Sequence, residues 1–257
     1  MASGSPRQLP DGTEWHAQYL RVITFPVESH VSDDQDWWRD VTDSEPETST
    51  RKPQSRVDSG VFEGSSLALE VSPLRVQWTL SPHLDPENLP TSFPTLGPVH
   101  QRRDRFIELM SRWLPDAPAI KRLVFAGNLV QFADTREECY QRLNQYLSHT
   151  DVDPSTSDFM YRVNRQTASG TGIPGLEVNR LCTWACVTLS FGMRVHSVPS
   201  GDARDVSIGE DQHACTIELD INTVPNSAGS ELPQDRLADI LVELAEFGLE
   251  IAEIGDV

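Results

Sequence analysis

Residues 159–184 read FMYRVNRQTASGTGIPGLEVNRLCTW, and this stretch decides the fold class. Two runs rich in β-branched and aromatic residues, 159–165 and 176–195, flank a turn that contains Ser169-Gly170-Thr171-Gly172. Small residues between two such runs are typical of a β-hairpin. The stretch therefore predicts two consecutive strands that pair antiparallel.

Further strands are predicted on both sides of this hairpin. Residues 15–27 are rich in β-branched and aromatic types, and 61–81 alternate apolar with polar residues around a turn at Pro73. Residues 120–132 and 215–224 also lack the apolar spacing of a helix and favour strands.

Only three long stretches carry apolar residues at helical spacing: 102–113, the segment from Thr135 to about His149, and the segment from about Pro233 onward. Thr135 and Glu138 have the spacing of a capping box. Strands in runs, interrupted by few helices, predict an α+β fold: a mostly antiparallel sheet with three main helices packed largely on one face.

We expect a single α+β domain over residues 15–257, after a disordered N-terminus at residues 1–14. Residues 28–59 are acidic and rich in Ser, Thr and Pro, so they predict a mobile loop. This segment contains the pair Trp37-Trp38, which has two interpretations. The pair is a short docking motif for a partner, or it folds back over an apolar patch.

The chain of 257 residues has a net charge of −18, distributed unevenly. Residues 202–257 hold fourteen acids and two arginines, whereas 101–194 are close to neutral. Such a field disfavours direct nucleic-acid binding and anionic membranes, and it favours a basic protein partner. No stretch is apolar enough to span a membrane and the first residues do not form a secretory signal, so we expect a cytoplasmic protein. The sequence is also compatible with a homo-oligomer.

The four cysteines offer one weak alternative to a purely apolar role. Cys182 and Cys186 lie on one face of a predicted strand, and His213 and Cys215 share a face of a later strand. If those strands are neighbours, the four side chains could bind zinc. The spacing differs from the usual Cys-x2-Cys turn, so we expect buried thiols and no cofactor.

Two Asn-Arg pairs, Asn164-Arg165 and Asn179-Arg180, are the strongest candidate for a binding site. They lie fifteen residues apart and would come together if the hairpin forms, with Arg162 nearby. Arg and Asn side chains bind carboxylate or phosphate groups well. The alternative is that these arginines pair with acids of the fold.

No catalytic motif is present in the sequence. Gly170-x-Gly172-x-x-Gly175 has the spelling of a dinucleotide-binding loop, but it runs into a strand. That motif needs a helix N-terminus at the pyrophosphate, so we reject it.

Several clustered motifs carry a resemblance to known proteins. They are SDFxYxVNR at 157–165, GLxVNRLxxW at 175–184 and LDINT at 219–223, followed by Glu253-Ile254-Gly255-Asp256. Over residues 70–257 the chain resembles a sporadically distributed family of uncharacterised bacterial proteins of similar length. The resemblance implies no activity, cofactor or catalytic residue. Its patchy distribution is typical of genes in defence or toxin–antitoxin loci.

We therefore expect a non-catalytic, cytoplasmic binding or regulatory protein that docks a protein partner. The expectation rests on the acidic C-terminal part and on the absence of a catalytic motif. The alternative is an enzyme or ligand sensor with an anion pocket lined by the Asn-Arg pairs.

Overall fold

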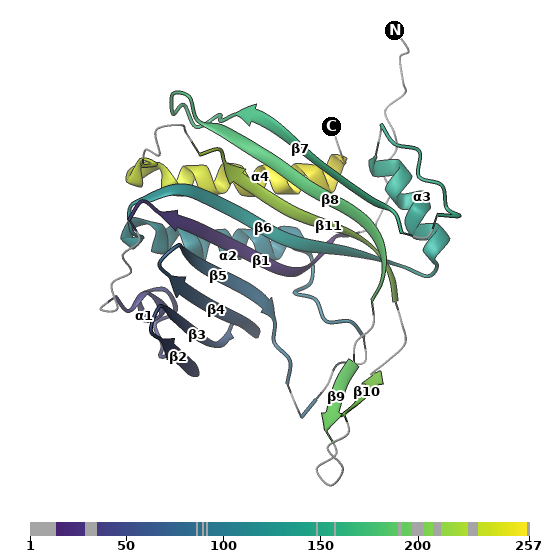
Figure 1. The fold of residues 1–257 in the computed structure, drawn as a ribbon, viewed down its shortest axis with the longest axis horizontal. Helices are drawn as coiled ribbons and strands as arrows, with labels where there is room; N and C mark the ends of the chain where they lie inside the picture. Colours follow the sequence, from purple (N-terminus) through teal and green to yellow (C-terminus); the bar gives the residue numbers. More distant parts are fainter. Residues whose placement is uncertain are drawn as a thin grey trace.

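The computed structural model describes residues 14–28, 35–85, 87, 88, 90, 92–147, 149–156, 158–189, 192–196, 203–207, 212–225 and 231–255. Within these ranges, nine strands form one antiparallel sheet in the order β2-β3-β4-β5-β1-β6-β11-β8-β7, and β9 pairs with β10 separately (Figure 1). The strands of the large sheet are β1 (His16–Pro26), β2 (Thr48–Lys52), β3 (Ser55–Phe62), β4 (Ser65–Ser72), β5 (Arg75–Pro82), β6 (Ile120–Ala133), β7 (Met160–Ala168), β8 (Glu177–Leu189) and β11 (Gln212–Thr223).

The other elements are four α-helices, two short 3-10 turns and the small hairpin. The helices are α1 (Trp37–Thr42), α2 (Val99–Trp113), α3 (Arg136–Tyr146) and α4 (Leu237–Ile254), and the hairpin consists of β9 (Gly192–His196) and β10 (Ala203–Ser207). The 3-10 turns are Leu114–Asp116 and Gln234–Arg236. None of the described helices is both long and apolar enough to cross a membrane.

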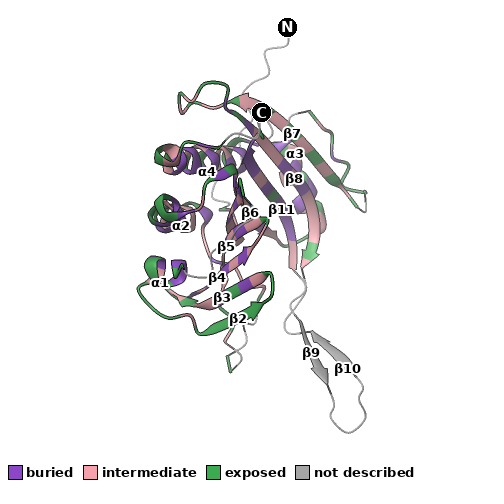
Figure 2. Ribbon diagram, turned by 60° about the vertical axis from the view of Figure 1, so that its left-hand side comes forward, coloured by how far each residue is buried: buried purple, intermediate pink, exposed green. Residues whose placement is uncertain are grey.

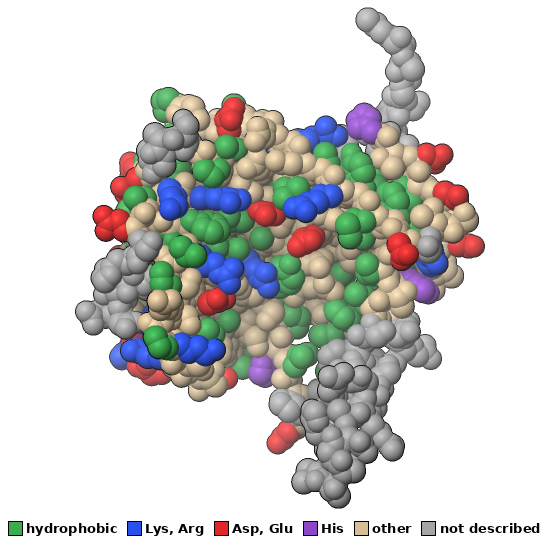
Figure 3. Space-filling model, in the orientation of Figure 1, with side chains coloured by type: hydrophobic (Ala, Val, Ile, Leu, Met, Phe, Trp, Pro, Cys, Tyr) green, Lys and Arg blue, Asp and Glu red, His purple; other side chains and the backbone are tan. Residues whose placement is uncertain are grey.

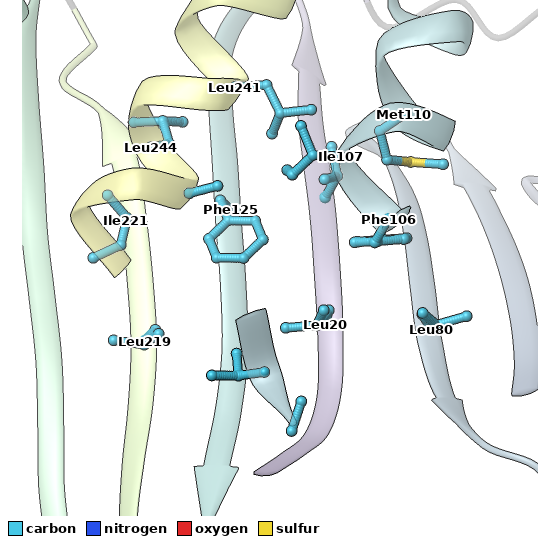
Figure 4. Close-up of a cluster of buried hydrophobic side chains, with 14 of the residues drawn as sticks. Leu20, Leu80, Phe106, Ile107, Met110, Phe125, Leu219, Ile221, Leu241 and Leu244 are labelled. Atoms are coloured by element: carbon cyan, nitrogen blue, oxygen red, sulfur yellow. The ribbon is translucent and has the colours of Figure 1, made fainter. Parts of the chain in front are cut away.

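The helices lie on one face of the large sheet, and the core fills the space between them. Figure 2 shows α1, α2 and α4 along one side of the strands. Alternate residues of the strands point to this side, so Phe125 of β6 and Ile221 of β11 lie in one apolar cluster with Leu241 and Leu244 of α4 (Figure 4). Burying one such side chain contributes about 1.5–3 kcal/mol. The predicted α+β class, with a mostly antiparallel sheet and helices on one face, is confirmed.

Gly248 explains how α4 approaches the sheet so closely. A Cβ atom built on this glycine would lie 3.3 Å from Leu219 and 3.3 Å from the ring of Phe125. The missing side chain therefore lets the helix rest directly on β6 and β11.

Part of the expected loop at residues 28–59 has regular structure, which corrects that prediction. Where this segment is described, it forms α1, β2 and most of β3. The structure also divides the long strand predicted over 176–195, since β8 ends at Leu189 and β9 begins at Gly192. Residues 1–13, most of the expected disordered N-terminus, lie outside the described residues.

Candidate functional site

The two Asn-Arg pairs do come together, because β7 and β8 form the predicted hairpin. Arg165 lies opposite Arg180, and Gln166 lies opposite Asn179. Successive residues of a strand point to opposite faces of the sheet, so the asparagines and the arginines separate. The arginines face the helices, and the asparagines face the side that carries no helix, which we call the open face. The side chains of the two Asn-Arg pairs therefore do not all line one side of the sheet.

Arg180 is an internal partner of α4 rather than part of an open site. Its guanidinium lies 3.0 Å from a carboxylate oxygen of Glu250 and stacks over the ring of Phe247, with 4.9 Å to the ring centroid. The side chain is only 14% exposed. This pairing matches the alternative in which the arginines pair with acids of the fold.

On the open face, side-chain amides form a hydrogen-bonded row across three strands, which we call the amide ladder. Asn164 on β7 donates to Asn179 Oδ1 on β8 over 3.0 Å, and Gln166 donates to the same oxygen over 2.9 Å. Asn179 donates in turn to Asn222 on β11 over 3.0 Å, and Asn222 donates to the carboxylate of Asp220 over 2.8 Å. The ladder fixes the side chains of β7, β8 and β11 relative to one another.

Charged and aromatic side chains continue the open face toward the centre of the sheet. Arg21 on β1 lies over the ring of Tyr19, 4.2 Å from its centroid, and Arg122 on β6 lies over Phe25. Burial raises the pKa of Tyr19 above its ordinary value; Arg21 opposes this shift, and the carboxylate of Glu218 adds to it. Tyr19 on β1 and Glu218 on β11 are register partners of the same β6 residue, one on each side. The side chains of Tyr19, Arg21, Arg122 and Glu218 therefore form one band, which we call the central band.

Most of the charges in this band have no partner of opposite sign. In the described ranges, Arg21 and Arg122 of this band make no salt bridge, and neither does Arg162 on β7, whereas Arg75 on β5, the strand next to β1, pairs with Glu70 over 3.0 Å. Glu218 is exposed and likewise forms no ion pair there. The band therefore presents both signs of charge to its surroundings.

Apolar side chains lie between these charges. Ile23, Phe25 and Leu181 are half-buried on the open face, and Val124 is buried. Figure 3 shows hydrophobic, basic and acidic side chains interspersed over the face of the sheet turned toward the viewer. An antiparallel sheet face that meets only water usually presents mostly polar residues. The open face differs, because apolar side chains are mixed with the charged ones.

Trp37 and Trp38 fold back over an apolar patch, which was one of the two alternatives. They are 3% and 1% exposed, respectively. Trp37 packs against Trp113 of α2, and Trp38 stacks on Trp78 of β5. Neither ring is available to a partner while α1 is in place.

Three of the cysteines gather between α3 and the sheet, and they differ from the four side chains of the weak zinc alternative. Cys186 and Cys215 are register partners on β8 and β11, and Cys215 Sγ donates to the backbone carbonyl of Cys139 on α3 over 3.2 Å. The contact with Cys186 lowers the pKa of Cys139, but the contact with Cys215 and burial outweigh it and raise that pKa to about 12. The contact with Cys139 and burial also raise the pKa of Cys186. His213 instead pairs with Thr188, 3.2 Å away. In the residues that the structure describes, no group of three or more His, Cys, Asp or Glu side chains is placed to hold a metal ion.

The acidic C-terminal part is also partly engaged within the fold. Glu243 on α4 accepts hydrogen bonds from Ser169 Oγ, over 2.6 Å, and from the backbone N–H of Gly170 in the β7–β8 turn. Asp239 pairs with Arg236. Several of the acids that suggested a basic partner therefore already bind groups of this chain.

Sequence reasoning missed the central band of the open face, Tyr19, Arg21, Arg122 and Glu218. Its signal was the alternation of Tyr19, Arg21, Ile23 and Phe25 within one strand, which puts them on a single face.

No family model matches this chain, and no curated protein is significantly similar to it. The candidate function therefore rests on the fold and on the open face.

Proposed function

We propose that this chain is a non-catalytic binding protein that docks a protein partner on the open face of its sheet. The supporting observation is a set of unpaired charges on the open face, Arg21 and Glu218 in the central band and Arg162 on β7, set among half-buried apolar side chains. Protein interfaces are enriched in Arg and Tyr and combine apolar contacts with complementary charges. A partner that presents acids toward the arginines and a base toward Glu218 would satisfy this band.

The proposed setting is the cytoplasm of a bacterium, within a defence or toxin–antitoxin locus. The resemblance to a sporadically distributed bacterial family supports this setting. The net charge of −18 supports a partner that is basic overall, since long-range attraction between opposite charges speeds association, while the contact surface of that partner presents acids to the arginines of the open face. In such a locus, the protein would neutralise or regulate an effector by covering its surface.

The alternative, an enzyme or sensor with an Asn/Arg-lined anion pocket, has less support. Arg180 is engaged with Glu250 on the other face of the sheet, away from Asn164 and Asn179. Of the arginines that the sequence suggested for this pocket, Arg162 alone shares the open face with these amides among the described residues, and it is exposed.

The test compares two double variants of identical net charge. Arg162→Glu with Glu218→Arg reverses two exposed charges on the open face, and Arg112→Glu with Glu253→Arg reverses two exposed charges on the helix side. Tagged forms are purified from the source bacterium, and the co-purifying proteins are quantified by mass spectrometry. We expect the unmodified protein and the helix-side variant to retain one stoichiometric partner that the open-face variant loses.

Circular dichroism shows whether both variants are folded. The partner should dissociate more readily as salt is added, because screening weakens the attraction between exposed charges. Retention of the partner by a folded open-face variant would contradict the proposal.

A further inference from the structure

The two edges of the large sheet differ in how they are protected from pairing with another strand. At one edge, β2 has five residues, includes Arg51 and Lys52 and is followed by Pro53. Short length, charge and proline are common devices that block edge-to-edge pairing. At the other edge, β7 has nine residues and contains no proline; its charged residues are Arg162 and Arg165, on opposite faces of the sheet.

The edge strand β7 is regular along its whole length. Its register with β8 runs from Met160 to Ala168 without a bulge, and Met160 is 70% exposed. In the described residues no strand pairs with its outer side, because β7 ends the sheet order. A long, regular edge of this kind presents backbone N–H and C=O groups to an incoming strand.

The sequence of β7 is compatible with itself in an antiparallel pairing about a two-fold axis. Residues opposite each other must share a face, and like charges directly opposite are unfavourable. An axis at Arg162 or Arg165 would place that arginine against its own copy. An axis at Asn164 pairs all nine residues and puts Arg162 opposite the partner's Gln166.

The amide ladder ends at this same edge. Asn164 uses its Nδ2 to bind Asn179, and its Oδ1 has no hydrogen bond within the described residues. With the axis at Asn164, its carboxamide faces the partner's Asn164, and a side-chain amide can both donate and accept. The ladder would then run from Asn222 of one copy to that of the other without interruption.

We propose that β7 joins two copies of this chain into a two-fold symmetric dimer, in which the β7 strands pair antiparallel with Asn164 opposite the partner's Asn164. The dimer forms one continuous sheet and displays the two open faces side by side. It does not rest on the proposed function, although both involve Arg162; the variants Asn164→Asp and Gln166→Glu, which leave Arg21, Arg162 and Glu218 unchanged, distinguish the dimer from the proposed function.

The first measurement is sedimentation equilibrium of the purified full chain over a range of concentrations. We expect a concentration-dependent rise from the monomer mass of 28.7 kDa to twice that value. A mass that remains monomeric at the highest soluble concentration would overturn the proposal.

Two single substitutions then test the register, and each adds one negative charge to the same face of the same strand. Asn164→Asp places two carboxylates opposite each other and should raise the dimer dissociation constant about fivefold. Gln166→Glu places a carboxylate opposite the partner's Arg162 at two symmetric positions and should lower that constant roughly threefold. If the two substitutions change the dissociation constant equally, the two-fold register is refuted. Equal changes are expected if β7 captures a strand of another protein instead.

A charge exchange covers the case in which Asn164→Asp does not fold. Arg162→Glu removes the cation near the axis, and Gln166→Arg added to it restores an opposite-charge pair at both symmetric positions. We expect the double variant to dimerise more tightly than Arg162→Glu alone. Added salt should weaken the dimer of the double variant. A dimer that is insensitive to every one of these substitutions uses another surface and rules out the β7 contact.

Discussion

Trp38 on α1 stacks on Trp78 of β5, with ring centroids 6.1 Å apart and ring planes inclined by 23°. Trp78 also meets Trp113 of α2 edge to face, and Trp37 packs on the other side of Trp113. Four tryptophans from three elements thus hold a six-residue helix that is too short to be stable alone.

Replacing Trp38 with alanine should destabilise the protein by about 3–5 kcal/mol, because it empties a buried site and removes a stacking contact. Urea unfolding monitored by circular dichroism measures the change. Arg39→Ala on the exposed side of the same helix is the control, and it should cost less than about 0.5 kcal/mol. Similar costs for both substitutions would show that α1 is not anchored through its tryptophans.

A second prediction concerns Arg56 and Asp58, a salt bridge of 2.9 Å on β3 with side chains 7% and 6% exposed. Replacing Asp58 with alanine leaves the guanidinium buried without its counter-charge and should cost about 3–5 kcal/mol. The exposed pair Arg39–Glu45 provides the comparison, since Glu45→Ala should cost at most about 1 kcal/mol. Thermal unfolding of the two variants distinguishes the buried pair from the exposed one.

Gly255 should tolerate no side chain. Its backbone has a φ of +84°, and a Cβ atom there would overlap the backbone carbonyl of Tyr146 at the end of α3. Gly255→Ala should therefore cost more than about 2 kcal/mol, through both strain and displacement of the chain end. Gly64→Ala, which also has a positive φ but meets no atom within 4 Å, separates the strain from the clash. Equal destabilisation by both would mean that contact with α3 contributes nothing.

Arg180 and Glu250 should be coupled in a double-mutant cycle. Arg180→Ala loses both the ion pair and the packing over Phe247, so we expect a cost of about 2 kcal/mol, against about 1 kcal/mol or less for Glu250→Gln. Because Glu250 is 42% exposed, the coupling energy should be only about 0.5–1 kcal/mol. Additive effects in chemical unfolding would show that the stacking on Phe247, rather than the ion pair, holds the guanidinium.

Alkaline pH should weaken the fold through Cys139. The pKa of this thiol is about 12 in the folded protein and 9.0 ordinarily, so the unfolded chain releases the proton first. Stability is therefore fully present below pH 9 and falls as the pH rises toward 12, by up to about 1.4 kcal/mol per pH unit for this group. Cys139→Ala should unfold with a shallower pH dependence, measured in urea between pH 8 and 10. Parallel profiles for the two proteins would contradict the assignment.

The strands and helices that the sequence predicts correctly are those whose apolar residues meet the core at regular spacing. Val22, Trp78 and Leu219 lie on such strands, and each is buried. The strands that the sequence did not predict, β2 and most of β3, lack apolar residues at regular spacing. All five residues of β2 are exposed, and two of the buried positions of β3 are filled by Arg56 and Asp58, so the pattern there resembles a loop.

The candidate site was predicted only where it is local in sequence. The hairpin correctly brought Asn164 to Asn179, since only the turn separates their strands. The band around Arg21 and Glu218 joins residues almost two hundred positions apart, which depends on β6 lying between β1 and β11. Strand order of this kind follows from packing of the whole chain and not from the pattern within any one strand.

That strand order also constrains how the protein is made. The last strand, β11 (Gln212–Thr223), lies between β6 and β8, which are both complete earlier in the chain. While the ribosome is still adding residues before 212, β6 and β8 each lack a neighbour on one side, and half of the sheet cannot join the other half. The nascent chain thus carries two open edges until β11 itself has been synthesised, a period in which strands are prone to misassembly.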